Sequence, residues 1–419
     1  MYEWSSTDLM IRDSMREFIA KEIRPNLDAL ESGEMLPYPI IRKLFANFGV
    51  DVMGSEALKK DLDKQRLKES GAARPEGSSN GAGAGMPAGA VTMGAIAVAE
   101  LAGACLGIIA SAGVSVGLAA STIKSRGTLA QQERWLPDLV TFDKIGAWAI
   151  TEPDSGSDAF GGMKSYVTRD GEDYILTGQK TFITNGPDAD VTVVYAKLDD
   201  GSGVDKRDRP VLAFVLDKGM DGFTQGKAFH KMGMNASPTG ELFFDNVRLG
   251  RDRLLGETET HASGDGRDSA RSSFTAERVG VAVLSLGIIN ECHRLCIDYA
   301  KNRKLWGQEI GRFQLVQLKL AQMEIARINV QNMVFAALER AQAGKPPTLA
   351  EASAMKIYSS QAATEVAMEA VQLFGGNGYM TEYRVEQLAR DAKSLMIYAG
   401  SNEVQVTHVA KGLLGLSRL

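Results

Sequence analysis

The sequence predicts an α+β protein, mostly α, with an N-terminal helical domain, a middle β-barrel-like domain and a C-terminal four-helix bundle. Residues 1 to about 53 and 91–125 carry apolar residues at helical spacing, and residues 145–247 change to short alternating runs. Long helical periodicity returns in the last third of the chain. With 419 residues, of which 44% are hydrophobic, the chain can build two or three domains around a sizeable core. We expect these domains at 1–144, 145–250 and 272–419.

The N-terminal domain is expected to begin with a capped amphipathic helix near residues 7–10. Acidic residues such as Asp8 and Asp13 interrupt any apolar run there, so no signal peptide is expected. Residues 71–89 are rich in Gly, Ala, Ser and Pro and cannot bury enough apolar surface to become ordered alone. We therefore expect a flexible insertion at about 55–90, which is either a tolerated surface loop or a lid over a pocket.

Residues 101–122 contain no charged side chain and are long enough to span a bilayer. They are mostly Gly, Ala and Ser, whose transfer to lipid gains little, so we expect a closely packed buried helix and no membrane span. The net charge of -5 shows no basic bias, which argues against a nucleic-acid partner.

The three cysteines, Cys105, Cys292 and Cys296, lie in apolar helical segments. This favours reduced thiols in a cytoplasmic compartment of bacterial type or one like the mitochondrial matrix. Cys292 and Cys296 would share a helix face, but no second cluster completes a set of four ligands. Core packing is therefore expected at these residues, and no metal site.

The middle and C-terminal domains are defined by their strand and helix patterns. Strands are predicted at 174–176, 191–195, 211–216 and 241–244. A polar loop is predicted at 257–271, followed by helices at 276–301, 313–343, 348–374 and 404–414. These helix lengths suit an antiparallel bundle. No glycine-rich segment has the spacing and the strand context of a dinucleotide- or nucleotide-binding loop, so any such cofactor would be bound by another device.

Four segments carry a family resemblance: WAITEPDSGSD at 148–158, LTGQKTFITN at 176–185, QLFGGNGY at 372–379 and RDAK at 390–393. In this order they resemble the flavin-dependent acyl-CoA dehydrogenases, and the resemblance covers nearly the whole chain. It implies an FAD-dependent enzyme that oxidises a saturated acyl-CoA to the trans-2-enoyl-CoA.

The resemblance also implies how FAD is held. Residues of the middle domain are expected at the flavin ring, where hydrogen bonds to the ring stabilise its reduced form; they are Ile150, Thr151, Gly156, Ser157, Phe182 and Thr184. Other residues are expected to reach the pyrophosphate and adenosine from a neighbouring subunit; they are Arg303, Trp306, Gln314, Gln372 and Gly376. Glu403 is expected near the adenine, and Ser401, where relatives commonly have Thr, is also expected to bind the cofactor. A site built from two chains implies a homo-oligomer, by resemblance a tetramer arranged as a dimer of dimers.

The catalytic base is expected away from its commonest position. Many family members carry a catalytic Glu where this chain has Ala399, whereas members of isovaleryl and long-chain type carry it directly before the Arg of the first bundle helix, as in FTAERV at 274–279. The resemblance therefore implies that Glu277 removes the α-proton and that the backbone N–H of Ala399 polarises the thioester. Glu277 is also explained by helix capping with Thr275 and by the helix dipole. As a base it should have its pKa raised by desolvation.

Substrate contacts are expected from Ser157, Thr275, Arg278 and Tyr398, with Arg278 on the pantetheine. Straight-chain members keep a bulky Tyr at the position of Tyr398, and the small residues of 97–120 would leave room for a medium to long chain. An electron-transferring flavoprotein is the expected acceptor. The alternatives are a dehydrogenase for branched-chain or cyclic acyl-CoA, an acyl-CoA oxidase, and a non-catalytic acyl-CoA-binding flavoprotein subunit.

Overall fold

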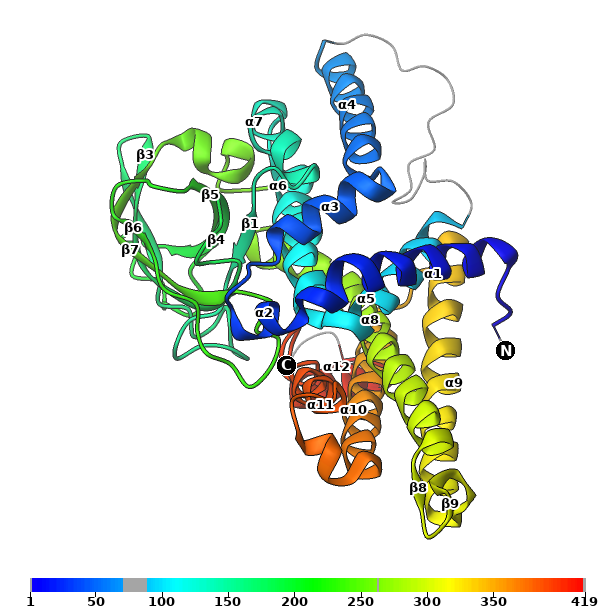
Figure 1. Cartoon of the computed structure of the whole chain (residues 1–419). Helices are drawn as coiled ribbons and strands as arrows, with labels where there is room; N and C mark the ends of the chain where they lie inside the picture. The colour runs from blue at the N-terminus through cyan, green and yellow to red at the C-terminus, as the bar shows by residue number, and fades with distance from the viewer. Residues whose placement is uncertain (1, 71–88, 262–263, 417–419) are drawn as a thin grey trace.

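The computed structural model describes residues 2–70, 89–261 and 264–416. Helices of the N-terminal region are followed by a curved β sheet and then by a C-terminal helical domain (Figure 1). The predicted fold class, α+β and mostly α, is confirmed.

The N-terminal region is entirely helical within the described residues. Ser5 caps its first helix, because the Ser5 hydroxyl accepts the Asp8 N–H at 3.1 Å and the Asp8 carboxylate accepts the Ser5 N–H at 2.9 Å. The helices are α1 (Ser6–Phe18), α2 (Leu27–Ser32), α3 (Tyr38–Phe48), α4 (Val50–Glu69), α5 (Ala90–Ala112), α6 (Ser121–Arg126) and α7 (Leu129–Val140). A π-helical stretch, Gly113–Ala120, joins α5 to α6.

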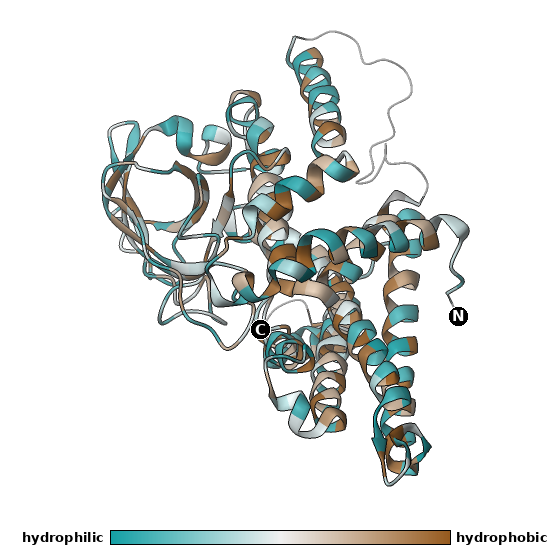
Figure 2. Cartoon of the chain, in the orientation of Figure 1, coloured by the Kyte–Doolittle hydropathy of each residue, from teal (hydrophilic) through white to brown (hydrophobic). Residues whose placement is uncertain are grey.

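The first part of the flexible insertion expected at about 55–90 is instead helical. The whole of 55–69 lies in α4, and residues 71–88 lie outside the described part of the chain. α4 is largely hydrophilic (Figure 2) and buries only Leu58 and Leu62 among its described side chains. It contains four Lys, three Leu and two Glu, which favour a helix without a wide apolar stripe. An ion pair from Arg66 to Glu133 of α7, 2.6 Å long, also holds it against the domain.

The uncharged segment predicted as a buried helix forms the crossing between α5 and α8 (Gly266–Asn302). A Cβ atom on Gly103 would lie 2.6 Å from the Gly287 carbonyl oxygen, and one on Gly287 would collide with the Ala99 carbonyl oxygen. Only glycine allows two backbones to approach so closely. Within the described residues, two helical stretches, 91–126 and 266–302, are long and apolar enough to cross a membrane by length and composition. Both pack in the core beside one another, as core helices do.

The middle domain is a seven-stranded sheet in the order β1-β4-β2-β3-β7-β6, with β5 paired to β4. Its strands are β1 (Gly146–Ala149), β2 (Tyr166–Asp170), β3 (Asp173–Thr184), β4 (Val191–Leu198), β5 (Val211–Asp217), β6 (Phe223–Gln225) and β7 (Thr239–Leu249). The sheet curls around its own apolar core, which includes Val194, Phe214 and Leu242. The four predicted strands fall within β3, β4, β5 and β7.

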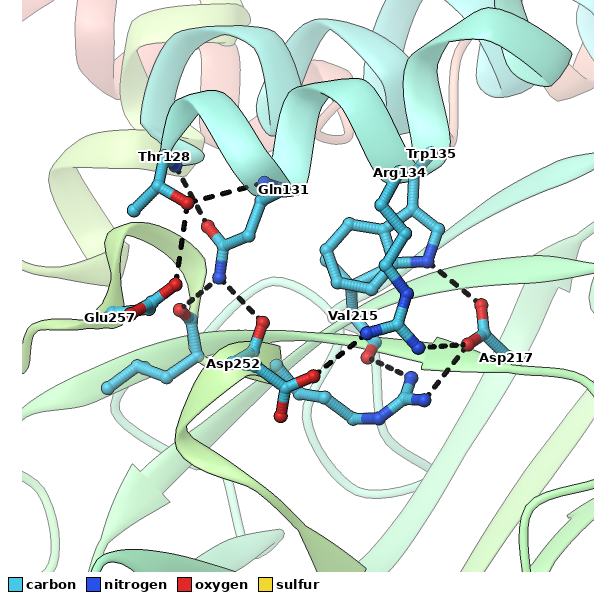
Figure 3. A network of polar contacts seen from close by, with 10 residues as sticks. Thr128, Gln131, Arg134, Trp135, Val215, Asp217, Asp252 and Glu257 are labelled. Carbon is cyan, nitrogen blue, oxygen red and sulfur yellow. Dashed lines mark hydrogen bonds and ion pairs between the residues drawn. The ribbon is translucent and has the colours of Figure 1, made fainter. Parts of the chain in front are cut away.

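A polar network fastens this sheet to α7 (Figure 3). The Trp135 indole donates to Asp217 at 2.9 Å, and Arg134 pairs with both Asp217 and Asp252. Gln131 donates at 2.8 Å to the carbonyl oxygens of Asp252 and Leu254. The middle domain is therefore joined to the helices by directional polar contacts in addition to apolar packing.

The C-terminal domain contains α8, α9 (Gln314–Gln342), α10 (Leu349–Phe374), α11 (Val385–Ser394) and α12 (Asn402–Leu414), with a hairpin of β8 (Lys304–Leu305) and β9 (Gln308–Glu309) between α8 and α9. The four predicted helices correspond to α8, α9, α10 and α12. Cys292 and Cys296 are fully buried in its core.

Two features of this domain differ from the sequence prediction. The loop expected at 257–271 ends early, because Asp265 accepts the Arg267 N–H at 2.8 Å and so starts α8 at Gly266. The short helix α11, which no predicted segment covers, buries Val385, Leu388 and Ala392 against the bundle.

Candidate active site

The segment that follows β1 is fixed by a buried ion pair. The Lys180 ammonium of β3 lies 2.8 Å from the Glu152 carboxylate, and their side chains are 0% and 4% exposed. Lys180 also donates to the Ile150 carbonyl oxygen at 3.0 Å, and Glu152 accepts the backbone N–H groups of Lys164 and Ser165. Because every partner of this buried pair is satisfied, it holds the backbone at Ile150 and Thr151 in one position.

Phe182 is held in an unusual conformation beside this segment. Its φ is 57°, a left-handed value that is uncommon for a bulky residue, and 67% of its surface is exposed. It lies where the register between β3 and β7 shifts, between Lys180 and Ile183. Thr184, Gly156 and Ser157 are partly or fully exposed on the same domain. The exposed Phe182 ring can pack against the face of a planar ring, and the Ser157 and Thr184 hydroxyl groups can hydrogen-bond to its polar edge.

The turn after α11 exposes a backbone donor. Ala399 and Gly400 have φ values of 56° and 81°. The carbonyl oxygens of both residues accept the Gln405 side-chain amide at 3.0 Å, and that of Gly400 also accepts the Lys356 ammonium at 2.8 Å. The Ala399 N–H donates to no group in the described part of the chain. The turn therefore has fixed carbonyl groups and a free N–H.

Glu277 lies beside this turn. Its side chain is partly buried in α8, and desolvation raises its pKa from 4.5 to about 7, against the opposing effects of Arg278 and Lys356. The same carboxylate contributes to raising the pKa of Tyr398. Within the described ranges the Glu277 carboxylate accepts no hydrogen bond. The structure thus brings Glu277, Lys356 and Tyr398 together, with an acid whose neutral form is favoured by burial.

Arg278 faces the interior between α8 and α10. It is 3% exposed, donates to the Ser353 hydroxyl at 3.1 Å and lies over the Phe274 ring at 5.5 Å. Its Nε is buried without a partner. Thr275 is half-buried one turn away. A groove of about 1380 Å³ opens beside Phe274, between the starts of α8 and α10 and the end of α12.

The remaining predicted residues lie at the far end of the helical domain. Their side chains or backbone are exposed to solvent; they are Arg303, Trp306, Gln314, Gln372 and Gly376. Trp306 is 86% exposed with a φ of 49°. The Tyr299 ring stacks on Phe374 at 4.0 Å and so joins the β8–β9 end of α8 to the end of α10. In Figure 1 the β8–β9 hairpin and the sheet lie at opposite ends of the molecule, so a single chain does not bring these two sets together.

Ser401 and Glu403 begin α12, where Glu403 is exposed and Ser401 partly buried. The neighbouring residues Lys356, Asn402 and Gln405 were not among the predicted site residues. Lys356 had one signal in the sequence, a single charge within an apolar stretch of the helix at 348–374. Glu152 and Lys180 were missed too, although both stand in the segments that carry the resemblance.

The sequence matches three successive family profiles: Acyl-CoA dehydrogenase, N-terminal domain at 55–143, middle domain at 147–247 and C-terminal domain at 264–414. It is 35% identical over 409 residues to an acyl-CoA dehydrogenase of Bacillus subtilis, with 97% of this chain and 98% of the relative covered. The chain belongs to the acyl-CoA dehydrogenase family.

Solved structures of two other acyl-CoA dehydrogenases are similar along nearly their whole length. Butyryl-CoA dehydrogenase from Megasphaera elsdenii has a TM-score of 0.80 at 31% identity, with 99% of this chain and 100% of that chain covered. A glutaryl-CoA dehydrogenase from Mycobacterium smegmatis in complex with FADH2 has a TM-score of 0.82 at 26% identity, with 99% and 96% covered. The chain is thus an oxidoreductase and a flavoprotein of this family, and its cofactor is FAD.

The described residues of this acyl-CoA dehydrogenase suit FAD. The ion pair of Glu152 and Lys180 fixes the backbone at Ile150 and Thr151, and Phe182 presents an exposed ring beside it. At the other end, Arg303 and Trp306 are exposed and offer a cation and an aromatic face for a dinucleotide. When bound, FAD would supply the acceptor for the hydride that leaves the β-carbon of the acyl chain.

Proposed function

We propose that this acyl-CoA dehydrogenase oxidises a straight-chain, medium to long acyl-CoA to the trans-2-enoyl-CoA, with Glu277 as the base. The observation that carries the proposal is that the desolvated carboxylate of Glu277 lies beside a turn with a free backbone N–H at Ala399. The pKa of Glu277 is raised to about 7 by burial, and the Ala399 N–H in the neighbouring turn has no partner in the described structure. A carboxylate takes a weakly acidic α-proton only when a donor stabilises the developing enolate oxygen.

Substrate binding follows from the same surroundings. Arg278 is proposed to hold the pantetheine and Thr275 to contact CoA; in support, the buried Nε of Arg278 has no hydrogen-bond partner in the described structure. Ser157 is proposed to contact both flavin and substrate. Tyr398 supports a straight chain because its bulk lies at the turn beside Glu277. The small residues here have two roles: Gly103 and Gly107 of α5 are closely packed, whereas nothing lies within 4 Å of a Cβ on Gly113 or Gly117 of the π-helical stretch that follows. The second pair supports room for a longer chain.

The FAD site is proposed to be shared between two subunits of a dimer of dimers. One chain would supply Ile150, Thr151, Gly156, Ser157, Phe182 and Thr184 together with Ser401 and Glu403, and its neighbour Arg303, Trp306, Gln314, Gln372 and Gly376. Two observations support the proposal: Trp306 is exposed, and the sheet and the β8–β9 hairpin of one chain lie at opposite ends of the molecule in Figure 1. An electron-transferring flavoprotein is the proposed acceptor, in a cytoplasmic compartment of bacterial type or one like the mitochondrial matrix.

Anaerobic titration of the holoenzyme with saturated acyl-CoAs of increasing length tests this function. Wild type is expected to lose its flavin absorbance with medium or long chains, whereas Glu277→Gln keeps its flavin and bleaches far more slowly. Equal bleaching of both proteins would contradict the role of Glu277. Bleaching only by branched or cyclic acyl-CoA would contradict the straight chain, and peroxide formation in air would indicate an oxidase. No bleaching by any acyl-CoA would favour a non-catalytic binding subunit.

A further inference from the structure

Lys356 is a buried cation that the reaction described so far does not use. It lies in α10 among apolar side chains, and its own side chain is 0% exposed. Lysine is almost never fully buried unless it is paired, because removing its ammonium from water is costly. Within the described structure its hydrogen-bond acceptors are neutral oxygens, and no carboxylate forms an ion pair with it. Its position therefore calls for another explanation.

The Lys356 ammonium is directed at the turn that carries Ala399. It donates at 2.8 Å to the Gly400 carbonyl oxygen and at 2.8 Å to the Asn402 side-chain oxygen. The Asn402 amide donates in turn to Ser360, 3.1 Å away, so Lys356 and Asn402 join the turn to α10. Gln405 fixes the carbonyl groups of Ala399 and Gly400 from the other side. With these carbonyls held and φ positive at both residues, the Ala399 N–H has one direction available.

The same ammonium acts on Glu277 through space. The charge of Lys356 opposes the rise in the pKa of Glu277, and Glu277 in turn opposes the fall in the pKa of Lys356 to about 8, which desolvation causes. Arg278 on α8 acts on both groups, and Glu403 on α12 acts on Lys356. One step further away, Asp391 on α11 acts on Tyr398, and Arg278 acts on His408 of α12. Lys356 differs from these groups because its ammonium is also bonded to the donor turn.

We propose that Lys356 is a positioning residue that aims the Ala399 N–H at the thioester oxygen and supplies positive charge beside the Glu277 carboxylate. The inference rests on the proposed function of Glu277 and Ala399 and adds a third group to it. One side chain then links the two halves of the reaction: it orients the donor for the enolate oxygen and favours the ionised form of the base. A purely structural lysine would only fix the turn.

The pH dependence of flavin bleaching separates these two roles. The second-order bleaching rate at low acyl-CoA, measured against pH, reports the groups of the free holoenzyme. Lys356→Met is expected to lower this rate on the order of a hundredfold, the effect of losing one preorganised donor. It should also move the midpoint up by about one pH unit, because a nearby cation no longer favours the carboxylate. Lys356→Arg, which keeps the charge, should restore the midpoint.

Two further variants keep the test decisive. Ser360→Ala weakens the same network without removing charge, so its midpoint should match that of wild type. Lys356→Gln keeps an amide donor and lacks the charge, and it replaces the Met variant if that protein does not fold. A midpoint equal to wild type in Lys356→Gln or Lys356→Met would overturn the charge role, and an unchanged rate in Lys356→Met would overturn the positioning role. If Glu277→Gln bleaches like wild type, the proposed function fails; if it does not bleach and Lys356→Met behaves as wild type, only the present inference fails.

Discussion

Replacing Glu277 by Gln should make the protein more stable while it strongly slows the oxidation of acyl-CoA. Burial raises the pKa of Glu277 from 4.5 to about 7. At about 1.4 kcal/mol per unit of pKa, this rise corresponds to about 3 kcal/mol in the free energy of unfolding. The folded protein binds the proton more tightly than the unfolded chain, so wild-type stability is lost as the pH rises from about 4.5 through about 7. A neutral Gln of the same shape does not have this loss.

The assay is denaturant unfolding of the FAD-bound protein at pH 5 and pH 9, without acyl-CoA, for wild type and Glu277→Gln. The advantage of the variant should grow by about 3 kcal/mol between the two pH values. Exposed Glu382, changed to Gln, is the matched control and should show no comparable growth. In the same preparations, Glu277→Gln should bleach on the order of a hundred to ten thousand times more slowly, the usual contribution of a general base. If the free energy of unfolding changed equally with pH in wild type and Glu277→Gln, the argument from desolvation of Glu277 would be refuted.

Three further outcomes are expected. Lys180→Met should be isolated with little flavin, because breaking a buried ion pair costs about 3–5 kcal/mol and releases the backbone at Ile150. The ratio of flavin to protein absorbance measures the flavin content, and a full content would contradict this prediction. Trp306→Ala should bind FAD more weakly than wild type. Its FAD-free form should have the same melting temperature as FAD-free wild type, since Trp306 is 86% exposed. Unchanged flavin affinity would argue against a shared site. Gly287→Ala should destabilise the protein by about 1–3 kcal/mol through its collision with Ala99, whereas Gly117→Ala, with open space around it, should melt no earlier than wild type.

The sequence predicted elements with strong periodicity better than elements with weak periodicity. The apolar rows of α8, α9 and α10 identified these helices, and the alternating runs identified β4 and β5. α4 was partly taken for an insertion because it is polar on most of its surface, and α11 was missed because it is short. Helix ends depended on single caps such as Asp265, which periodicity does not reveal.

The site was predicted from motifs, and its supporting residues were not. Glu277 and Ala399 stand 122 positions apart, and only a family resemblance related them in the sequence. The left-handed backbone at the turn of Ala399 depends on Gln405 and Lys356, whose partners are fixed by the packing of α10 against α12. A buried lysine reads in the sequence as one more charge on a helix, and its role becomes visible only when its two acceptors are located.

The crossing of α5 and α8 also bears on how the chain folds during synthesis. A Cβ on Gly103 would lie 2.6 Å from the Gly287 carbonyl oxygen, yet the entire middle domain separates these two glycines in the sequence. One side of α5 packs against the N-terminal helices made before it, but the side that packs on α8 has no partner until α8 has left the ribosome, whereas the sheet carries its own core and can close earlier. We expect the middle domain to fold first on the ribosome, with the two helical parts joining around it once the chain is nearly complete.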